Sequence, residues 1–255
     1  MAEGKAVLYE VKDKVAYITL AQAERKNSLS RRLCGELHEA WLALEENRGV
    51  RVGIITGSGN VFCAGMDVDE VGEEFDPGIF NALNSAMPNH GLSSTKPVIA
   101  AINGWAIGAG FGLCVACDLR VASEKARFSF PEVKVGLCGG GLDMLNVMDT
   151  TVAVEMMLTG QPIDAQRAYQ AGLLNRVVPH EKLMEEAQKL ADVIKENAPL
   201  TMKMLKAYIF EHQKTLMQQW NNMYNTLIMS QIESHDSKEG IAAFGEKRPP
   251  QFRGE

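Results

Sequence analysis

The chain has 255 residues, 46% of them hydrophobic, so it is long enough to bury one sizeable core but short for two full domains. Its net charge of −6 comes from interspersed acidic and basic residues without a run of like charges, which argues against a nucleic-acid-binding patch. No apolar stretch reaches the ~18 residues of a membrane helix, and the first residues lack the pattern of a signal peptide. We therefore expect a soluble, cytoplasmic protein that acts on small molecules, without nucleic-acid or membrane partners.

The chain opens with an expected β-hairpin, because apolar residues alternate between Val7 and Thr19 around a break at Asp13-Lys14. A helix is expected next, since Ser30 is suited to the N-cap and an apolar stripe recurs every three or four residues. The stripe consists of Leu33, Leu37, Trp41 and Leu44.

Strands and helices then alternate. Apolar runs predict strands at residues 51–56, 97–103, 118–122 and 127–130. Helical patterns occupy residues 77–92 and 108–117. The alternation predicts an α/β fold, a layered core of βα repeats with right-handed crossovers.

Helical patterns predominate from Thr151 onward and are interrupted only by a strand-like segment at 173–178. The predicted helices cover residues 151–159, 164–171, 180–197, 200–213 and about 215–233. Pro199 marks a boundary, because the residue before a proline avoids helical geometry. We expect an α/β core over residues 1–198 and a C-terminal helical region over residues 199–255.

All five cysteines lie in apolar sequence, which is typical of reduced thiols in a protein core. They are Cys34, Cys63, Cys114, Cys117 and Cys138. Cys114 and Cys117 have the CxxC spacing of zinc and redox sites, but no second CxxC or HxxxH pattern completes a metal site. A structural role is therefore favoured, and no metal is expected.

Two glycine-rich segments, residues 62–67 and 103–112, each follow a predicted strand. Glycine lets the main chain approach a ligand closely, and the first N–H groups of a helix are unpaired and partially positive. Two such segments can hold a developing oxyanion, although tight helix–strand packing would also account for the glycines. Residues 108–112 superficially resemble the GxGxxG fingerprint of dinucleotide-binding folds, but the final spacing is absent and the segment comes late in the chain.

Seven segments, in order over nearly the whole chain, resemble the crotonase (enoyl-CoA hydratase/isomerase) superfamily. They are AGMD at 64–67, PVIAAINGWAIGAGFG at 97–112, ACDLRVAS at 116–123, ARFSFPEVKVGL at 126–137, MMLTG at 156–160, AGLLNRVVP at 171–179 and AAFGEKRPP at 242–250. The resemblance implies a crotonase-like spiral core with C-terminal helices and an acyl-CoA thioester substrate. It does not imply one reaction, because the superfamily hosts several on one scaffold.

The resemblance also implies that the peptide N–H groups of Met66 and Ala109 form an oxyanion hole for the thioester carbonyl. Removing one such donor typically costs about 2.7–4 kcal/mol of transition-state stabilisation. The positions around the hole that are expected to contact the substrate are Ala64, Gly65, Asp67, Trp105 and Gly108.

Family members often carry two catalytic glutamates, and in this chain Gly112 stands at the first position and Glu132 at the second. A positioned carboxylate contributes about 10²–10⁴ in rate; the other interpretation of Glu132 is a surface acid in a turn. Gly112 leaves room beside the acyl group. Asp143, in a segment shorter than the family's usual one, could contact the substrate as an acid or base, but we favour a helix N-cap.

One carboxylate beside a stabilised enolate supports several reactions. It can add water to an α,β-unsaturated acyl-CoA, as members resembling hydroxycinnamoyl-CoA hydratase-lyase do with this glutamate alone. It can also shift a double bond, as a Δ3,Δ2-enoyl-CoA isomerase does. An enoyl-CoA hydratase, acting on a bulky, cyclic or aryl acyl group, is the leading hypothesis, and a non-catalytic acyl-CoA-binding protein is a further alternative. Tyr224, near Trp220, is interpreted as core packing rather than as a catalytic phenol.

Coenzyme A, as part of the substrate, is the only cofactor group that the resemblance implies. Its contacts are expected from Arg25 and Lys26, whose charges suit phosphate, and from Phe244 and Lys247 near the C-terminus. The C-terminal helices imply a homotrimer or a hexamer.

Overall fold

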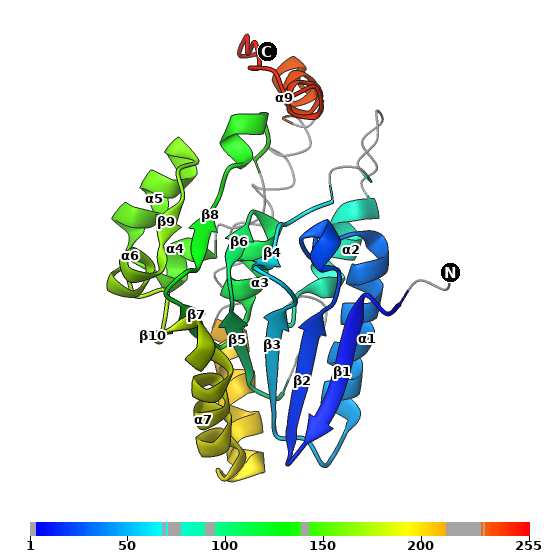
Figure 1. The fold of residues 1–255 in the computed structure, drawn as a ribbon, viewed down its shortest axis with the longest axis vertical. Coiled ribbons are helices and arrows are strands. Elements are labelled where there is room, and N and C mark those ends of the chain that lie inside the picture. Colours follow the sequence, from blue (N-terminus) through cyan, green and yellow to red (C-terminus); the bar gives the residue numbers. More distant parts are fainter. Residues whose placement is uncertain are drawn as a thin grey trace.

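The main sheet of the computed structural model has six strands in the order β1-β2-β3-β5-β7-β10 (Figure 1). The structure describes residues 4–67, 70, 78–89, 95–138, 143–212, 231 and 233–255. The six strands are β1 (Val7–Lys12), β2 (Val15–Leu20), β3 (Val52–Gly57), β5 (Val98–Ile102), β7 (Leu119–Ser123) and β10 (Arg176–Val178). β1 and β2 form the predicted antiparallel hairpin, and every other neighbouring pair is parallel.

A second sheet of four short strands adjoins the C-terminal ends of β3 and β5. Its strands, in sheet order, are β4 (Val61–Cys63), β6 (Trp105–Ile107), β8 (Arg127–Ser129) and β9 (Ile163–Asp164). β4 and β6 correct the sequence analysis, which read both segments as glycine loops. The chain enters the second sheet at Gly57 and at Gly104, where a Cβ would overlap the carbonyl oxygens of Phe62 and Asn60.

Helices cover both faces of the main sheet. They are η1 (Ala23–Arg25), α1 (Arg31–Glu46), α2 (Gly78–Ala86), α3 (Ala109–Ala116), η3 (Glu132–Val135), α4 (Met144–Val147), α5 (Thr150–Thr159), α6 (Ala165–Gln170), η4 (His180–Lys182), α7 (Leu183–Lys195) and α9 (His235–Gly245). Ile54 packs in the cluster that contains α7, whereas Ile55 packs in the cluster that contains α1. Successive strand residues point to opposite faces, so β3 is buried on both sides, as its apolar run predicts.

The predicted N-cap and stripe of α1 are confirmed. The Ser30 hydroxyl accepts a hydrogen bond from Leu33 N at 3.2 Å, which satisfies one of the free N–H groups in the first turn. The four stripe residues that the sequence analysis identified are buried. α1 is thus held against the sheet along its whole length, and its start is fixed next to the chain segment that leads from β2.

The C-terminal third contributes to the core as well as to helices. β10 extends the main sheet, and Leu183, Ala187 and Ala191 of α7 pack on its strands. Residues 199–212 are helical, and Lys206 forms an ion pair of 2.5 Å with Asp118. α9, at the upper end of Figure 1, was not predicted.

The helix predicted at 215–233 falls almost entirely outside the described residues, as do Trp220 and Tyr224. In the part of the chain that the structure describes, no helix combines the length and hydrophobicity needed to cross a membrane.

Candidate active site

The two glycine segments of the sequence analysis come together at the junction of the two sheets. Gly65 has a φ of +88°, and a Cβ on it would lie 2.5 Å from the carbonyl oxygen of Ile107 and 3.3 Å from the nitrogen of Ala109. Gly110 fits equally closely, because a Cβ there would overlap the main chain of Cys63. Contact this close is open only to glycine, and it brings the segments of Met66 and Ala109 side by side.

The N–H groups of Met66 and Ala109 lie in the two segments that meet here. Ala109 is the first residue of α3, where a backbone N–H has no partner inside the helix. Neither N–H donates a hydrogen bond within the residues that the structure describes. The flanking groups are anchored, since Leu29 N donates to Gly65 O at 2.7 Å and Gly108 N donates to Ser129 O at 2.9 Å.

Glu132 lies against the N-terminal end of α3. It is the first residue of η3, and a Cβ on Gly108 would lie 2.6 Å from its Oε1. Its Oε2 is buried and has no hydrogen-bond partner among the described residues. Burial raises the pKa of Glu132 to about 7. The structure therefore places the carboxyl group next to the Ala109 segment, in a state that can both accept and donate a proton near neutral pH.

The raised pKa of Glu132 gives a prediction for stability. The folded protein binds the carboxyl proton of Glu132 more tightly than the unfolded chain does, so protonation of Glu132 stabilises the fold. This stabilisation is complete below pH 4.5, the ordinary pKa of a glutamate, and is lost as pH rises through about 7. We expect the free energy of unfolding of the parent protein, relative to Glu132→Gln, to fall by about 2–3 kcal/mol between about pH 5 and pH 8. Urea denaturation at several pH values measures this difference. An identical pH dependence of the two proteins would show that Glu132 titrates normally.

Asp67 and Arg25 bind one another. Asp67 is 4% exposed and accepts hydrogen bonds from Arg25 Nη2 at 2.8 Å and from Ser28 Oγ at 2.9 Å. Lys26 O accepts from Ala64 N at 3.1 Å. These contacts join the loop predicted to bind coenzyme A to the loop predicted to bind the thioester, and they give Asp67 a structural anchoring role.

Asn27 joins the same two loops, and the sequence analysis did not identify it. Its fully buried side chain donates from Nδ2 to the carbonyl oxygens of Ser58 at 3.0 Å, Val61 at 2.8 Å and Phe62 at 3.2 Å. Its Oδ1 accepts from Gln22 N at 3.0 Å. A lone asparagine in the polar run Glu24–Asn27 carries no periodic signal, so only the packing reveals this role.

Replacing Asn27 by aspartate is expected to destabilise the protein by about 3–5 kcal/mol, because a buried carboxylate oxygen would face three carbonyl oxygens. Thermal and urea unfolding measure the effect. Asn146→Asp is the matched control, since Asn146 is exposed. Equal stability of the two variants would refute the role assigned to Asn27.

The remaining predicted substrate contacts differ in their surroundings. Gly112 lies one turn after Gly108 on α3, and a Cβ on it would meet no atom of the described residues within 4 Å. Trp105 is 38% exposed at the other end of β6 from Gly108. Asp143 occupies the N-cap position of α4, as expected, but its side chain forms no capping hydrogen bond there.

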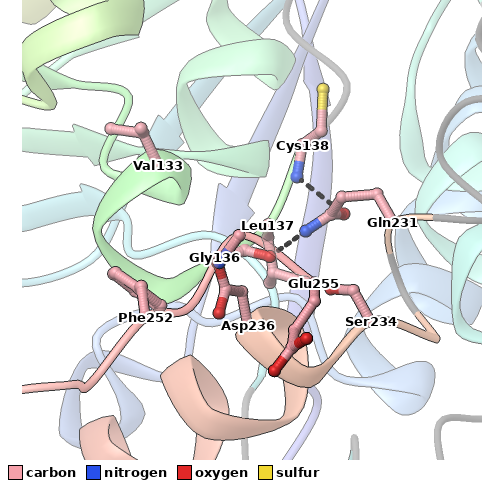
Figure 2. A pocket seen from close by; sticks show the side chains of 10 residues that line it. Val133, Gly136, Leu137, Cys138, Gln231, Ser234, Asp236, Phe252 and Glu255 are labelled. Carbon is pink, nitrogen blue, oxygen red and sulfur yellow. Dashed lines mark hydrogen bonds between the residues drawn. The ribbon is translucent and has the colours of Figure 1, made fainter.

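A cavity of about 440 Å³ is lined by η3 and by the residues that follow it in the chain (Figure 2). Its wall includes Gly136 and Cys138, which follow η3, and Gln231 and Phe252 from the C-terminal part of the chain. Figure 2 shows the side-chain amide of Gln231 bonded to both Gly136 and Cys138. It donates a hydrogen bond to Gly136 O and accepts one from Cys138 N at 3.2 Å. The segment that carries Glu132 is thus held by the C-terminal part of the chain.

α9 lies directly on η3. A Cβ on Gly136 would overlap the main chain of Asp236, and a Cβ on Gly240 would overlap that of Val135. Phe244 of this helix is 58% exposed, and Lys247 follows its end with a φ of +56°. The expected coenzyme A contacts of Arg25, Lys26, Phe244 and Lys247 remain predictions.

The cysteines divide into two groups. Cys34, Cys63, Cys114 and Cys117 are buried, as expected, but Cys138 is exposed, which corrects the sequence analysis. Partial burial of its thiol and the charge of Glu132 both raise the pKa of Cys138, although the residue as a whole is exposed. No group of three or more potential metal ligands is found in the described part of the chain.

Comparison with known proteins identifies relatives of this chain. A family model described as Enoyl-CoA hydratase/isomerase matches residues 10–255. An (E)-benzylidenesuccinyl-CoA hydratase from Thauera aromatica is 36% identical over 256 residues, which cover 97% of this chain and 99% of the relative. A 2,3-dehydroadipyl-CoA hydratase from Escherichia coli is 32% identical over 244 residues, which cover 94% of this chain and 96% of the relative.

A solved structure shows the same fold. The crystal structure of a carnitinyl-CoA hydratase from Mycobacterium avium matches with a TM-score of 0.90 and 31% identity, covering 99% of this chain and 100% of that one. The crotonase fold is thereby confirmed, and the relatives support hydratase activity. Since the family match includes both glycine segments, Glu132 and α9, the chain is an enzyme that belongs to the enoyl-CoA hydratase/isomerase family.

Proposed function

We propose that the protein is an enoyl-CoA hydratase in which Glu132 moves the proton and the N–H groups of Met66 and Ala109 bind the thioester oxygen. One observation carries the proposal. The buried carboxyl group of Glu132 lies against Gly108, immediately before the N–H that begins α3. A group for acid–base chemistry and a donor for oxyanion stabilisation are thus close together at the start of α3.

The reaction uses these groups in sequence. Ionised Glu132 accepts a proton from water as the water oxygen bonds to the β-carbon of the enoyl group. The electron pair of the double bond moves toward the α-carbon and the thioester oxygen, where two N–H groups stabilise the negative charge. Glu132 then returns the proton to the α-carbon. A pKa of about 7 suits a group that must both accept and donate.

The substrate that we propose has a bulky, cyclic or aryl acyl group. The open space at Gly112, one turn along α3 from Gly108, supports this size. A relative supports it as well, since the Thauera aromatica enzyme is named for a benzylidenesuccinyl-CoA, whose acyl group carries a ring. Assembly as a homotrimer or hexamer is proposed from family resemblance.

Filling the space at Gly112 tests the substrate class. Gly112→Leu is expected to lower kcat/KM for aryl enoyl-CoA esters at least tenfold more than for crotonyl-CoA, because a methylene in a pocket is worth about 1–3 kcal/mol. Gly112→Ala is the matched control with a smaller change in volume. Equal losses on both substrates would show that the acyl substituent lies elsewhere.

The reaction itself is tested by mass spectrometry of linear, cyclic and aryl enoyl-CoA esters incubated with the protein in ¹⁸O-labelled water. Gain of one labelled water by a panel member would establish hydration and name its acyl class. Unchanged mass with a shifted double bond, detected by chromatography, would replace the hydratase with an isomerase. Binding of the esters without either change would indicate a non-catalytic acyl-CoA-binding protein.

A further inference from the structure

A second cavity, of about 390 Å³, lies at the opposite end of the main sheet from Glu132. Arg51, which immediately precedes β3, and Lys96, two residues before β5, both line it. β3 and β5 run parallel, and both continue at their other ends toward the four-stranded sheet and the glycine segments (Figure 1). The cavity is therefore separated from the candidate active site by the length of these strands.

Positive charge is concentrated around this cavity, although the chain has a net charge of −6. Four cations and one carboxylate line it, namely Arg48, Arg51, Lys96, Lys203 and Glu45. Within the described part of the chain, the side chains of Arg48, Arg51 and Lys203 form no ion pair or hydrogen bond. Burial lowers the pKa of Lys96, and Arg51 lowers it further against the opposing effect of Glu45. The cations therefore repel one another, and an anion among them would relieve that repulsion.

The one carboxylate among these five side chains, Glu45, is hydrogen-bonded to Thr95. Glu45 accepts hydrogen bonds from Thr95 N at 2.9 Å and from the Thr95 hydroxyl. Lys96 Nζ donates to two neutral acceptors at the end of α1, Leu44 O at 2.7 Å and Asn47 O at 2.6 Å. These two carbonyl oxygens fix the position of the ammonium group in the wall of the cavity.

The shape of the cavity favours a small ligand. Its volume falls in the range of about 300–1,000 Å³ that is usual for small-molecule sites. Pro199 and Met202, from the start of the helix at 199–212, form part of its wall, and the N-terminus of a helix adds partial positive charge. Lysine and arginine together match the oxygen atoms of phosphate groups.

We propose that this cavity binds a small phosphorylated anion that carries two or more negative charges. The proposal goes beyond the hydratase function and does not depend on it. Its ligand is recognised by the phosphate groups, so inorganic pyrophosphate is a sufficient probe.

Isothermal titration of the intact protein with pyrophosphate, at constant ionic strength, tests the proposal. We expect one binding site per chain, with affinity lowered at least about tenfold by Arg51→Glu or by Lys203→Glu. Lys203 is exposed, so its variant is expected to fold normally even where Arg51→Glu does not. Lys238→Glu, an equal change of charge at an exposed position on α9, controls for net charge. Lys26→Glu controls for binding at the predicted coenzyme A site.

Retained affinity in both control variants, with weakened affinity in both cavity variants, would support the proposal. Three results would overturn it: no binding of pyrophosphate at millimolar concentration, unchanged affinity in Lys203→Glu, or an equal loss in Lys26→Glu. Because the readout is binding, these results are independent of whether the protein hydrates any enoyl-CoA ester.

Discussion

Replacing Glu132 by glutamine is expected to lower kcat for hydration by about 10²–10⁴, the contribution of a positioned acid–base group. Glutamine keeps the shape of the side chain beside Gly108 but cannot accept a proton from water. Binding of coenzyme A esters is expected to persist, since Glu132 contacts the end of α3 rather than the predicted phosphate contacts. Steady-state kinetics, with calorimetry of product binding, separate the two effects.

The parent protein should also show a pH dependence that the variant lacks. Hydration requires ionised Glu132, so kcat/KM is expected to rise with pH through about 7. Glu181→Gln, at an exposed position, is the matched control and should leave kcat unchanged. Full activity of Glu132→Gln would remove Glu132 from the mechanism.

Gly65→Ala is expected to produce the second large effect, a loss of about 10²–10³ in kcat/KM, the usual cost of losing one oxyanion-hole donor. The new Cβ would lie 2.5 Å from Ile107 O, at a φ of +88° that alanine rarely adopts. The loop must move away from α3, and Met66 N moves with it. A hydratase assay on purified, folded protein measures the loss.

Gly35→Ala provides the control for adding a methyl group. Gly35 is exposed within α1, and a Cβ there meets no atom within 4 Å in the described part of the chain. This variant is expected to keep its activity and to gain about 0.5–1 kcal/mol in stability, because alanine suits a helix interior better than glycine. If Gly65→Ala were equally active, the two loops would not form the oxyanion hole.

Much of the fold could be predicted because its long elements carry strong periodic signals. The stripe of α1 and the apolar runs of β3 and β5 gave helix and strand positions within a few residues. β4 and β6 were missed because each has only three residues, β4 at the start of one glycine-rich segment and β6 inside the other. Pairing between distant segments, not local preference, makes them strands.

Of the residues of the candidate site, some could be predicted from the sequence and others could not. Gly65, Gly108 and Glu132 could be identified from motifs, and the structure brings them together. Asn27 and Gln231 could not, because the hydrogen bonds that their amide nitrogens donate go to residues at least 31 positions away in the chain. Asp143 takes the predicted N-cap position, but the sequence pattern could not reveal that its side chain forms no capping hydrogen bond.

The candidate oxyanion hole is built from main-chain groups, and this determines which substitutions it can tolerate. Every residue except proline carries an N–H group, so the side chains at Met66 and Ala109 can change without loss of either donor. Gly65 and Gly110 have no such freedom, because main-chain atoms of the opposite segment occupy the space of a side chain. A search for distant relatives should therefore require these two glycines and exclude proline at 66 and 109, while accepting any other residue there.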